Sequence, residues 1–211
     1  MRNLSVEDVR NNPEFVLIKE LRFNEILMFV LENIRLINAY SIFYLFYNLI
    51  FISFLAGIAA FGFMEETLSF KPFLSCMGWG FLAGSILIIP FHEGFHALAF
   101  LMIGARSIKF GVDLKQMIFY ATAENFVAGR KDFILVAMAP FLIINLFSMP
   151  FVIYGGIELR LFMVVMLLLH NIMCIGDFAM LSFYRRFKEK EIYTFDDLET
   201  RTAWFYERVK N

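Results

Sequence analysis

The chain alternates between long apolar stretches and shorter polar ones. Four runs with few or no charged residues cover approximately residues 42–64, 73–103, 133–154 and 161–182. A helix needs about 20 such residues to cross the hydrocarbon core of a bilayer. We therefore predict an all-α integral membrane protein with four transmembrane helices.

The second run is longer than a bilayer requires, and it contains Pro90. A helix of this length must tilt, extend beyond the hydrocarbon or bend. Because the proline ring removes one backbone hydrogen bond from a helix, we predict a bend just before His92.

Composition and charge fit this interpretation. Of the 211 residues, 60% are hydrophobic and only 18% are charged, which is unusual for a soluble domain. Segments 1–41, 104–132 and 183–211 hold 17 of the 19 Lys and Arg residues. The positive-inside rule then predicts a multi-pass protein of the cell membrane with both termini cytoplasmic. We expect lipid and a protein substrate as partners, but no nucleic acid; the sequence leaves the oligomeric state open.

The segments outside the four runs predict smaller elements. Residues 1–41 predict one or two amphipathic helices on the cytoplasmic surface, beginning at a capping box of Ser5 and Asp8. Residues 183–211 predict a cytoplasmic tail helix, so that residues 42–182 form the transmembrane core.

Loop 104–132 contains Gly111 between two short β-prone runs. It predicts either a short β-hairpin or a plain connecting loop. The free edge of such a hairpin could hold an extended substrate segment by strand addition.

The second run contains the pattern His92-Glu93-Gly94-Phe95-His96, an HExxH motif. Residues four apart lie on one face of a helix, so both imidazoles can bind one metal ion. Glu93 then lies where it can take a proton from a water molecule at that ion. Titratable groups are expensive within a membrane, which favours a site over chance.

A hydrolytic zinc site needs a third protein ligand and a position for water. Asp177 lies near the middle of the fourth run, at a depth similar to that of His96. His170 is on the same face as Asp177 but about 10.5 Å away along a helix, too far for both to bind one ion. We predict that Asp177 is the ligand and that His170 supports a neighbouring group.

Three further residues invite simple interpretations. Asn145 in the third run either joins helices by hydrogen bonds or contacts a substrate backbone, and the first is favoured. Cys76 and Cys174 lie in apolar runs without metal-ligand spacing, so we interpret them as small buried side chains.

Together, three motifs resemble the core of site-2-protease-type intramembrane metalloproteases over approximately residues 75–185. They are the HExxH pattern, "APFLIIN" in the third run and "HNIMCIGD" in the fourth. More closely, the arrangement is similar to a small bacterial family of zincin membrane peptidases. The resemblance implies that His92, His96 and Asp177 bind zinc and that Glu93 is the base. The resemblance also implies that Asn171, in the last motif, lies near the substrate or the ligands.

The sequence thus predicts a peptidase with one zinc ion per chain that hydrolyses peptide bonds near the cytoplasmic half of the membrane. Manganese, cobalt and iron remain open, because imidazole and carboxylate ligands serve several metals. A non-catalytic alternative uses the metal, or a simple His–Asp hydrogen bond, to hold helices together. A third type, a prenyl-protein protease, would need a membrane-embedded glutamate after the motif, which the sequence lacks.

Overall fold

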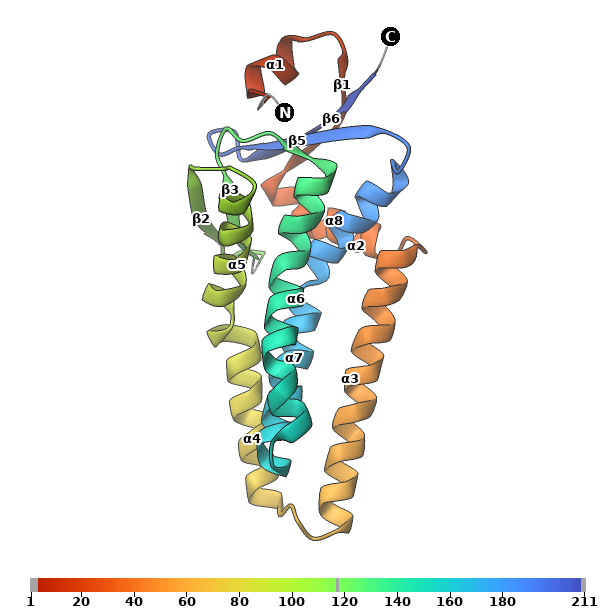
Figure 1. The fold of residues 1–211 in the computed structure, drawn as a ribbon, viewed down its shortest axis with the longest axis vertical. Helices are drawn as coiled ribbons and strands as arrows, with labels where there is room; N and C mark the ends of the chain where they lie inside the picture. The colour runs from red at the N-terminus through yellow and green to blue at the C-terminus, as the bar shows by residue number, and fades with distance from the viewer. Residues whose placement is uncertain (1–3, 117, 210–211) are drawn as a thin grey trace.

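A computed structural model of the protein describes residues 4–116 and 118–209. It shows a bundle of long helices with strands gathered at one end (Figure 1). The outermost positions of segments 1–41 and 183–211, and position 117 of the loop, lie outside the described residues. In chain order the α-helices are α1 (Val6–Asn11), α2 (Ile26–Ile34), α3 (Ala39–Met64), α4 (Phe70–Leu82), α5 (Ile89–Met102), α6 (Arg130–Tyr154), α7 (Ile157–Met173) and α8 (Ile175–Arg186).

Two sheets correct the prediction of a purely α-helical protein. One is a four-stranded sheet with the order β1-β6-β5-β4, and the other is a hairpin of β2 and β3. The strands of the two sheets are β1 (Phe15–Arg22), β2 (Ile108–Asp113), β3 (Ile118–Ala123), β4 (Ala128–Gly129), β5 (Glu191–Asp197) and β6 (Thr202–Arg208). The described residues also contain one short 3-10 helix, η1 (Phe23–Glu25).

Among the described residues, three helices are long and apolar enough to cross a membrane: α3, α6, and the continuous helix of residues 70–102 that contains α4 and α5. The pair α7 and α8 counts as a fourth span if its 43° bend lies within one crossing. In α6, 44% of the most apolar window is buried, against 11% in α3. Helix α6 therefore occupies the interior of the bundle, whereas most of the apolar surface of α3 is exposed on the outside of the bundle.

The irregularity in the second span is a π-helical segment, η2 (Ala83–Leu87), rather than a bend caused by proline alone. Its last turn is closed by a bond from the Ile88 N–H to the Ala83 carbonyl, five residues back. Pro90 follows in the first turn of α5, where a missing N–H is tolerated. The wide turn and the proline together begin the segment that carries the HExxH motif.

The prediction of a C-terminal tail helix was wrong. Residues 191–208 form β5 and β6, and β6 lies between β5 and β1 in the sheet. Partners far apart in sequence meet there, such as Phe15 and Arg208. The N-terminal segment contains helices α1 and α2 as expected, but β1 separates them. The predicted capping box is confirmed, with Ser5 and Asp8 bonded to each other's backbone N–H groups.

The predicted hairpin in loop 104–132 is confirmed as β2 and β3. Gly111 lies within β2 and not in the turn, beneath the ring of Tyr120, where a side chain would collide with that ring. In Figure 1 the hairpin stands beside α5, and strand β3 packs against that helix. The hairpin is thereby fixed next to the motif.

A cluster of buried aromatic and aliphatic side chains joins the sheet to the helices. Leu21 of β1 and Phe205 of β6 pack with Phe183 and Tyr184 of α8. Burial of such side chains stabilises the contact by about 1.5–3 kcal/mol each. The sheet is therefore a fixed layer over one end of the bundle, and the chain termini lie on that same end (Figure 1).

Candidate metal centre

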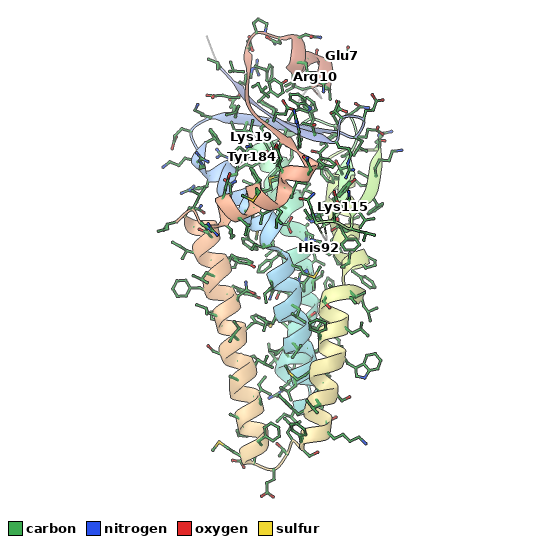
Figure 2. The ribbon with its side chains drawn as sticks, turned by 180° about the vertical axis from the view of Figure 1, so that it is seen from behind. Glu7, Arg10, Lys19, His92, Lys115 and Tyr184 are labelled. Carbon is green, nitrogen blue, oxygen red and sulfur yellow. The ribbon has the colours of Figure 1, made fainter. Side chains whose placement is uncertain are left out.

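His92 and His96 lie one turn apart on α5, and both are buried. Their Nε2 atoms point toward each other at 3.1 Å. Figure 2 shows His92 inside the bundle, close to the end that the sheet covers. The helical spacing expected from the sequence thus brings two imidazole nitrogens to one point.

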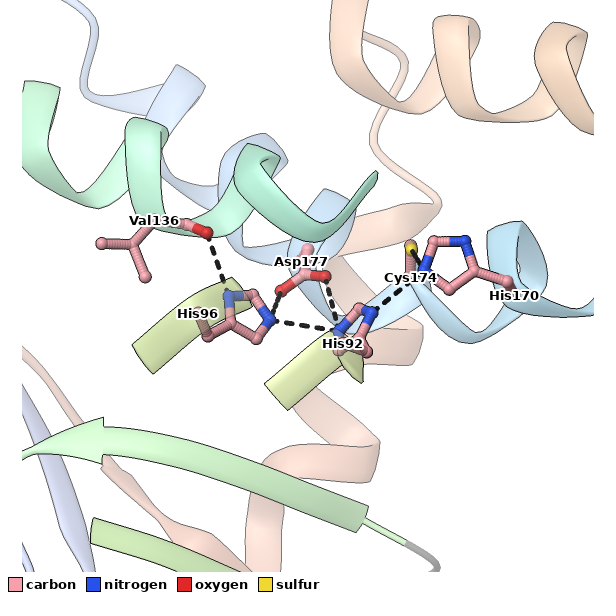
Figure 3. A network of polar contacts seen from close by, with 6 residues as sticks. All are labelled: His92, His96, Val136, His170, Cys174 and Asp177. Carbon is pink, nitrogen blue, oxygen red and sulfur yellow. Dashed lines mark hydrogen bonds and ion pairs between the residues drawn. The ribbon is translucent and has the colours of Figure 1, made fainter. Parts of the chain in front are cut away.

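Asp177 reaches this point from a different helix. It lies in the first turn of α8, directly after the break between α7 and α8 at Cys174. One carboxylate oxygen is 3.5 Å from His92 Nε2, and the other is 3.4 Å from His96 Nε2 (Figure 3). The bend between the helices turns the start of α8 so that the side chain meets α5.

These separations fit the donor set of a zinc ion. Ligands about 2.0–2.1 Å from a tetrahedral ion lie about 3.3–3.4 Å from one another. The two Nε2 atoms are 3.1 Å apart, and they lie 3.4 and 3.5 Å from different oxygens of the Asp177 carboxylate, all close to that value. Two neutral imidazoles and one carboxylate form a common hydrolytic ligand set, which leaves a fourth position for water.

The other ring nitrogens fix how the imidazoles are oriented. His96 Nδ1 lies 3.0 Å from the backbone carbonyl oxygen of Val136 in α6. His92 Nδ1 lies 3.2 Å from His170 Nε2 in α7 (Figure 3). If Nε2 is to bind a metal, the proton must be on Nδ1, where these two acceptors receive it. His170 is therefore not in the same ligand set as Asp177, but it contacts the opposite side of the His92 ring.

Cys174 is the residue of this region that sequence reasoning missed. Its sulfur lies 3.7 Å from His170 Nε2, one helical turn away. Among the described residues, His92, His170 and Cys174 form a second group whose ligand atoms lie within 4.8 Å of one another. The i to i+4 spacing of His170 and Cys174 was the available signal. His92 would have to serve both groups, through Nε2 in the first and Nδ1 in the second.

Glu93 faces the hairpin. The backbone N–H of Ala121 in β3 is directed at its carboxyl group. The Oε2 atom is buried and has no hydrogen-bond partner among the described residues. Such an acceptor is costly to bury unless it has a task, because its lone pairs lose water without compensation.

A cavity of about 530 Å³ extends from this centre toward the sheet. His92, Glu93, His96 and Asp177 all line it. These four side chains are polar or titratable, but most of the remaining lining is apolar. The apolar side chains come from α2, β3 and the inner face of the large sheet: Val30, Phe119, Tyr120 and Phe205, among others. The cavity is large enough for several residues of an extended peptide.

Asn145 and Asn171 lie elsewhere. Asn145 Nδ2 donates to Asn171 Oδ1 at 2.8 Å, and Tyr47 Oη donates to Asn145 Oδ1 at 3.0 Å. These bonds connect α6, α7 and α3, and neither asparagine lines the cavity. Their position corresponds to the helix-joining interpretation of Asn145.

A search of protein families finds one whose description is "Putative zincin peptidase", matching residues 85–192. This match spans half of the chain and contains the four residues that converge at the centre. No curated protein and no solved structure matches the chain.

Proposed function

The chain belongs to this zincin peptidase family, and we propose that it is a membrane-embedded zinc metallopeptidase. The observation that carries the proposal is the convergence of two imidazole nitrogens of α5 and the Asp177 carboxylate of α8 at one end of a cavity. Beside them lies a glutamate oxygen that has no hydrogen-bond partner among the described residues. His92, His96 and Asp177 would hold one zinc ion per chain. The bound ion supplies Lewis acidity toward the scissile carbonyl and toward water.

In this proposal the protein's own residues carry the proton transfers. Glu93 accepts a proton from the attacking water and delivers it to the nitrogen of the leaving amine as the peptide C–N bond breaks. His170 and the Val136 carbonyl hold the two imidazoles in the orientation that leaves each Nε2 free. The surrounding apolar side chains limit access of bulk water.

The hairpin would position the substrate. Residues of β3 line the cavity beside Glu93, and β2 pairs with one edge of this strand. Directly after β3, Glu124 forms an isolated bridge with Asp196 of β5, so the second edge is open only along the preceding residues. An extended peptide can bind to the second edge of β3 through backbone hydrogen bonds. The substrate would then be an unwound segment of a membrane protein, or a peptide at the membrane surface.

The charge distribution supports an orientation in which the sheet, the hairpin and both termini are cytoplasmic. All three basic segments lie at the end of the bundle that carries the centre. Cleavage would then occur toward the cytoplasmic side of the membrane.

Metal content is the first test. Detergent-purified wild type is expected to contain about one zinc per chain after zinc is supplied, and Asp177→Ala or His96→Ala is expected to lose it. Glu124→Gln is a suitable control, because Glu124 does not line the cavity and its side chain pairs with Lys109 at 3.9 Å. A wild type that binds no zinc would contradict the proposal.

Activity is the second test. Peptide termini in membranes of cells that express the wild type are compared with those in cells that express Glu93→Gln. Glu93→Gln is expected to retain zinc but to lose cleavage by a factor of about 10²–10⁴, since proton transfer is removed and the ligands are kept. Cleavage of a wild-type-dependent product at an unchanged rate would show that Glu93 is not the base.

A further inference from the structure

Asp196, on β5, lines the same cavity as Glu93 and the proposed ligands. Thr122 Oγ1 of β3 donates a hydrogen bond to its Oδ2 atom. Within the described part of the chain, no lysine, arginine or histidine forms an ion pair with it. The adjacent Asp197 is different, because it pairs with Arg10 at 2.9 Å. Asp196 is thus an acid without a counter-charge, placed in a mostly apolar cavity.

The hairpin connects Asp196 to the centre. Ala121, whose N–H is directed at Glu93, and Thr122, which bonds to Asp196, are neighbours on β3. A strand advances about 3.3 Å per residue. An extended peptide along β3 with its scissile bond at Glu93 would therefore carry a side chain near Asp196 within about two residues of that bond.

The surroundings of Asp196 suit a long basic side chain. Burial raises the pKa of Asp196, against the opposing effect of the Thr122 hydrogen bond, so the empty cavity disfavours the charged carboxylate. An incoming ammonium or guanidinium group would supply the missing opposite charge. The aliphatic stem of Lys or Arg can pack on an apolar wall such as Phe205, which lies on the same face of the large sheet as Asp196.

We propose that Asp196 anchors a subsite for the cationic side chain of a lysine or arginine within about two residues of the cleaved bond. This inference rests on the proposed peptidase function. The competing explanation is purely structural: the bond from Thr122 ties the hairpin to the large sheet, and the carboxylate binds nothing.

Hydroxamates, which chelate zinc, provide probes that need no known substrate. Two probes of equal length are compared, one with an aminoalkyl tail and one with an alkyl tail, on zinc-loaded protein in detergent. The aminoalkyl probe is expected to bind about tenfold more tightly to the wild type, and this preference is expected to disappear in Asp196→Asn. Asp197→Asn is the matched control and should keep the preference.

The outcomes distinguish failure of the subsite from failure of the peptidase proposal. Equal binding of both probes to the wild type overturns the subsite but leaves the peptidase proposal intact. Failure of both probes to bind the zinc-loaded wild type overturns the peptidase proposal and the subsite with it. If Asp196→Asn does not fold, a carboxyalkyl probe on the wild type decides, since the subsite requires it to bind more weakly than the alkyl probe. Thr122→Val, which keeps the acid, should retain the preference for the amine.

Discussion

At the scale of single residues, His92 has a different partner on each ring nitrogen. Its Nε2 faces His96 and Asp177, while its Nδ1 faces His170. An imidazole that binds a metal through one nitrogen is oriented by whatever accepts the proton of the other. His170 is therefore expected to act on metal affinity through His92 and not as a ligand.

Replacing His170 by alanine tests this role. We expect zinc affinity to fall by a factor of about 10–100, measured by competition with a chelator, because His92 loses the acceptor that fixes its ring. Asn48→Ala is the control: this asparagine of α3 is also buried, but its side chain bonds to the Tyr44 carbonyl of its own helix. It should lower stability and leave zinc affinity unchanged.

Cobalt substitution distinguishes the two possible ligand groups. Cobalt bound by His92, His96 and Asp177 has no sulfur ligand, so the wild type and Cys174→Ser should give the same spectrum. An intense thiolate-to-cobalt absorption that is lost in Cys174→Ser, but kept in Cys76→Ser, would place the ion beside His170 instead. Cys76 is a suitable control because it is buried in the core of the bundle.

The spacing of residues explains which parts of the centre the sequence could predict. His92, Glu93 and His96 follow from helical periodicity alone. Asp177 followed from a comparison of depths along two helices. Its approach to α5 depends on the 43° bend between α7 and α8. That bend also brings His170 to the far side of His92, a contact that a straight helix would not have indicated.

At the scale of elements, the π-helical segment η2 places the motif relative to α7. Gly84 lies in this segment, and an added Cβ would come within 2.9 Å of Leu169 Cβ and would also collide with the backbone of Met166. Close approach at Gly84 therefore sets the distance between the second span and α7, which carries His170.

Gly84→Val is expected to push these helices apart. We expect a loss of stability of about 1–3 kcal/mol from overpacking, measured by thermal unfolding in detergent, with lower zinc affinity. Gly78→Val is the control, because nothing lies within 4 Å of the position that its Cβ would occupy. Equal effects of the two substitutions would show that the close contact at Gly84 does not position α5.

The apolar spans and the hairpin could be predicted because their signals are local. The strands β5 and β6 could not, because their stability comes from partners that are distant in sequence. Trp204, for example, pairs with Glu20 across the sheet. The polar turn between β5 and β6 is rich in residues that also occur in helices, so the local pattern favoured a tail helix.

At the scale of the whole molecule, the centre, both sheets and the termini lie at one end of the bundle (Figure 1). The connection between α3 and α4 lies at the other end. If the basic end is cytoplasmic, Glu199→Cys in the β5–β6 turn should react with an impermeant maleimide only after cells are opened. Glu65→Cys at the end of α3 should react in intact cells.

The wild type supplies the baseline for this labelling, because Cys76 and Cys174 are both buried. The two substituted positions, Glu65 and Glu199, are exposed. Labelling of the two variants from the same side would contradict the arrangement of the spans, and labelling with the sides exchanged would reverse the orientation.

The position of β6 in the sheet has a consequence for biosynthesis. This strand follows all the described helices in the chain, yet it lies between β1 and β5, and its Phe205 lines the cavity. The helices can enter the membrane while the ribosome is still translating, but the layer over the centre is completed only when β6 emerges. For the proposed peptidase, this order means that a nascent chain has an incomplete centre until β6 has been synthesised, so that cleavage would begin only after the cavity is complete.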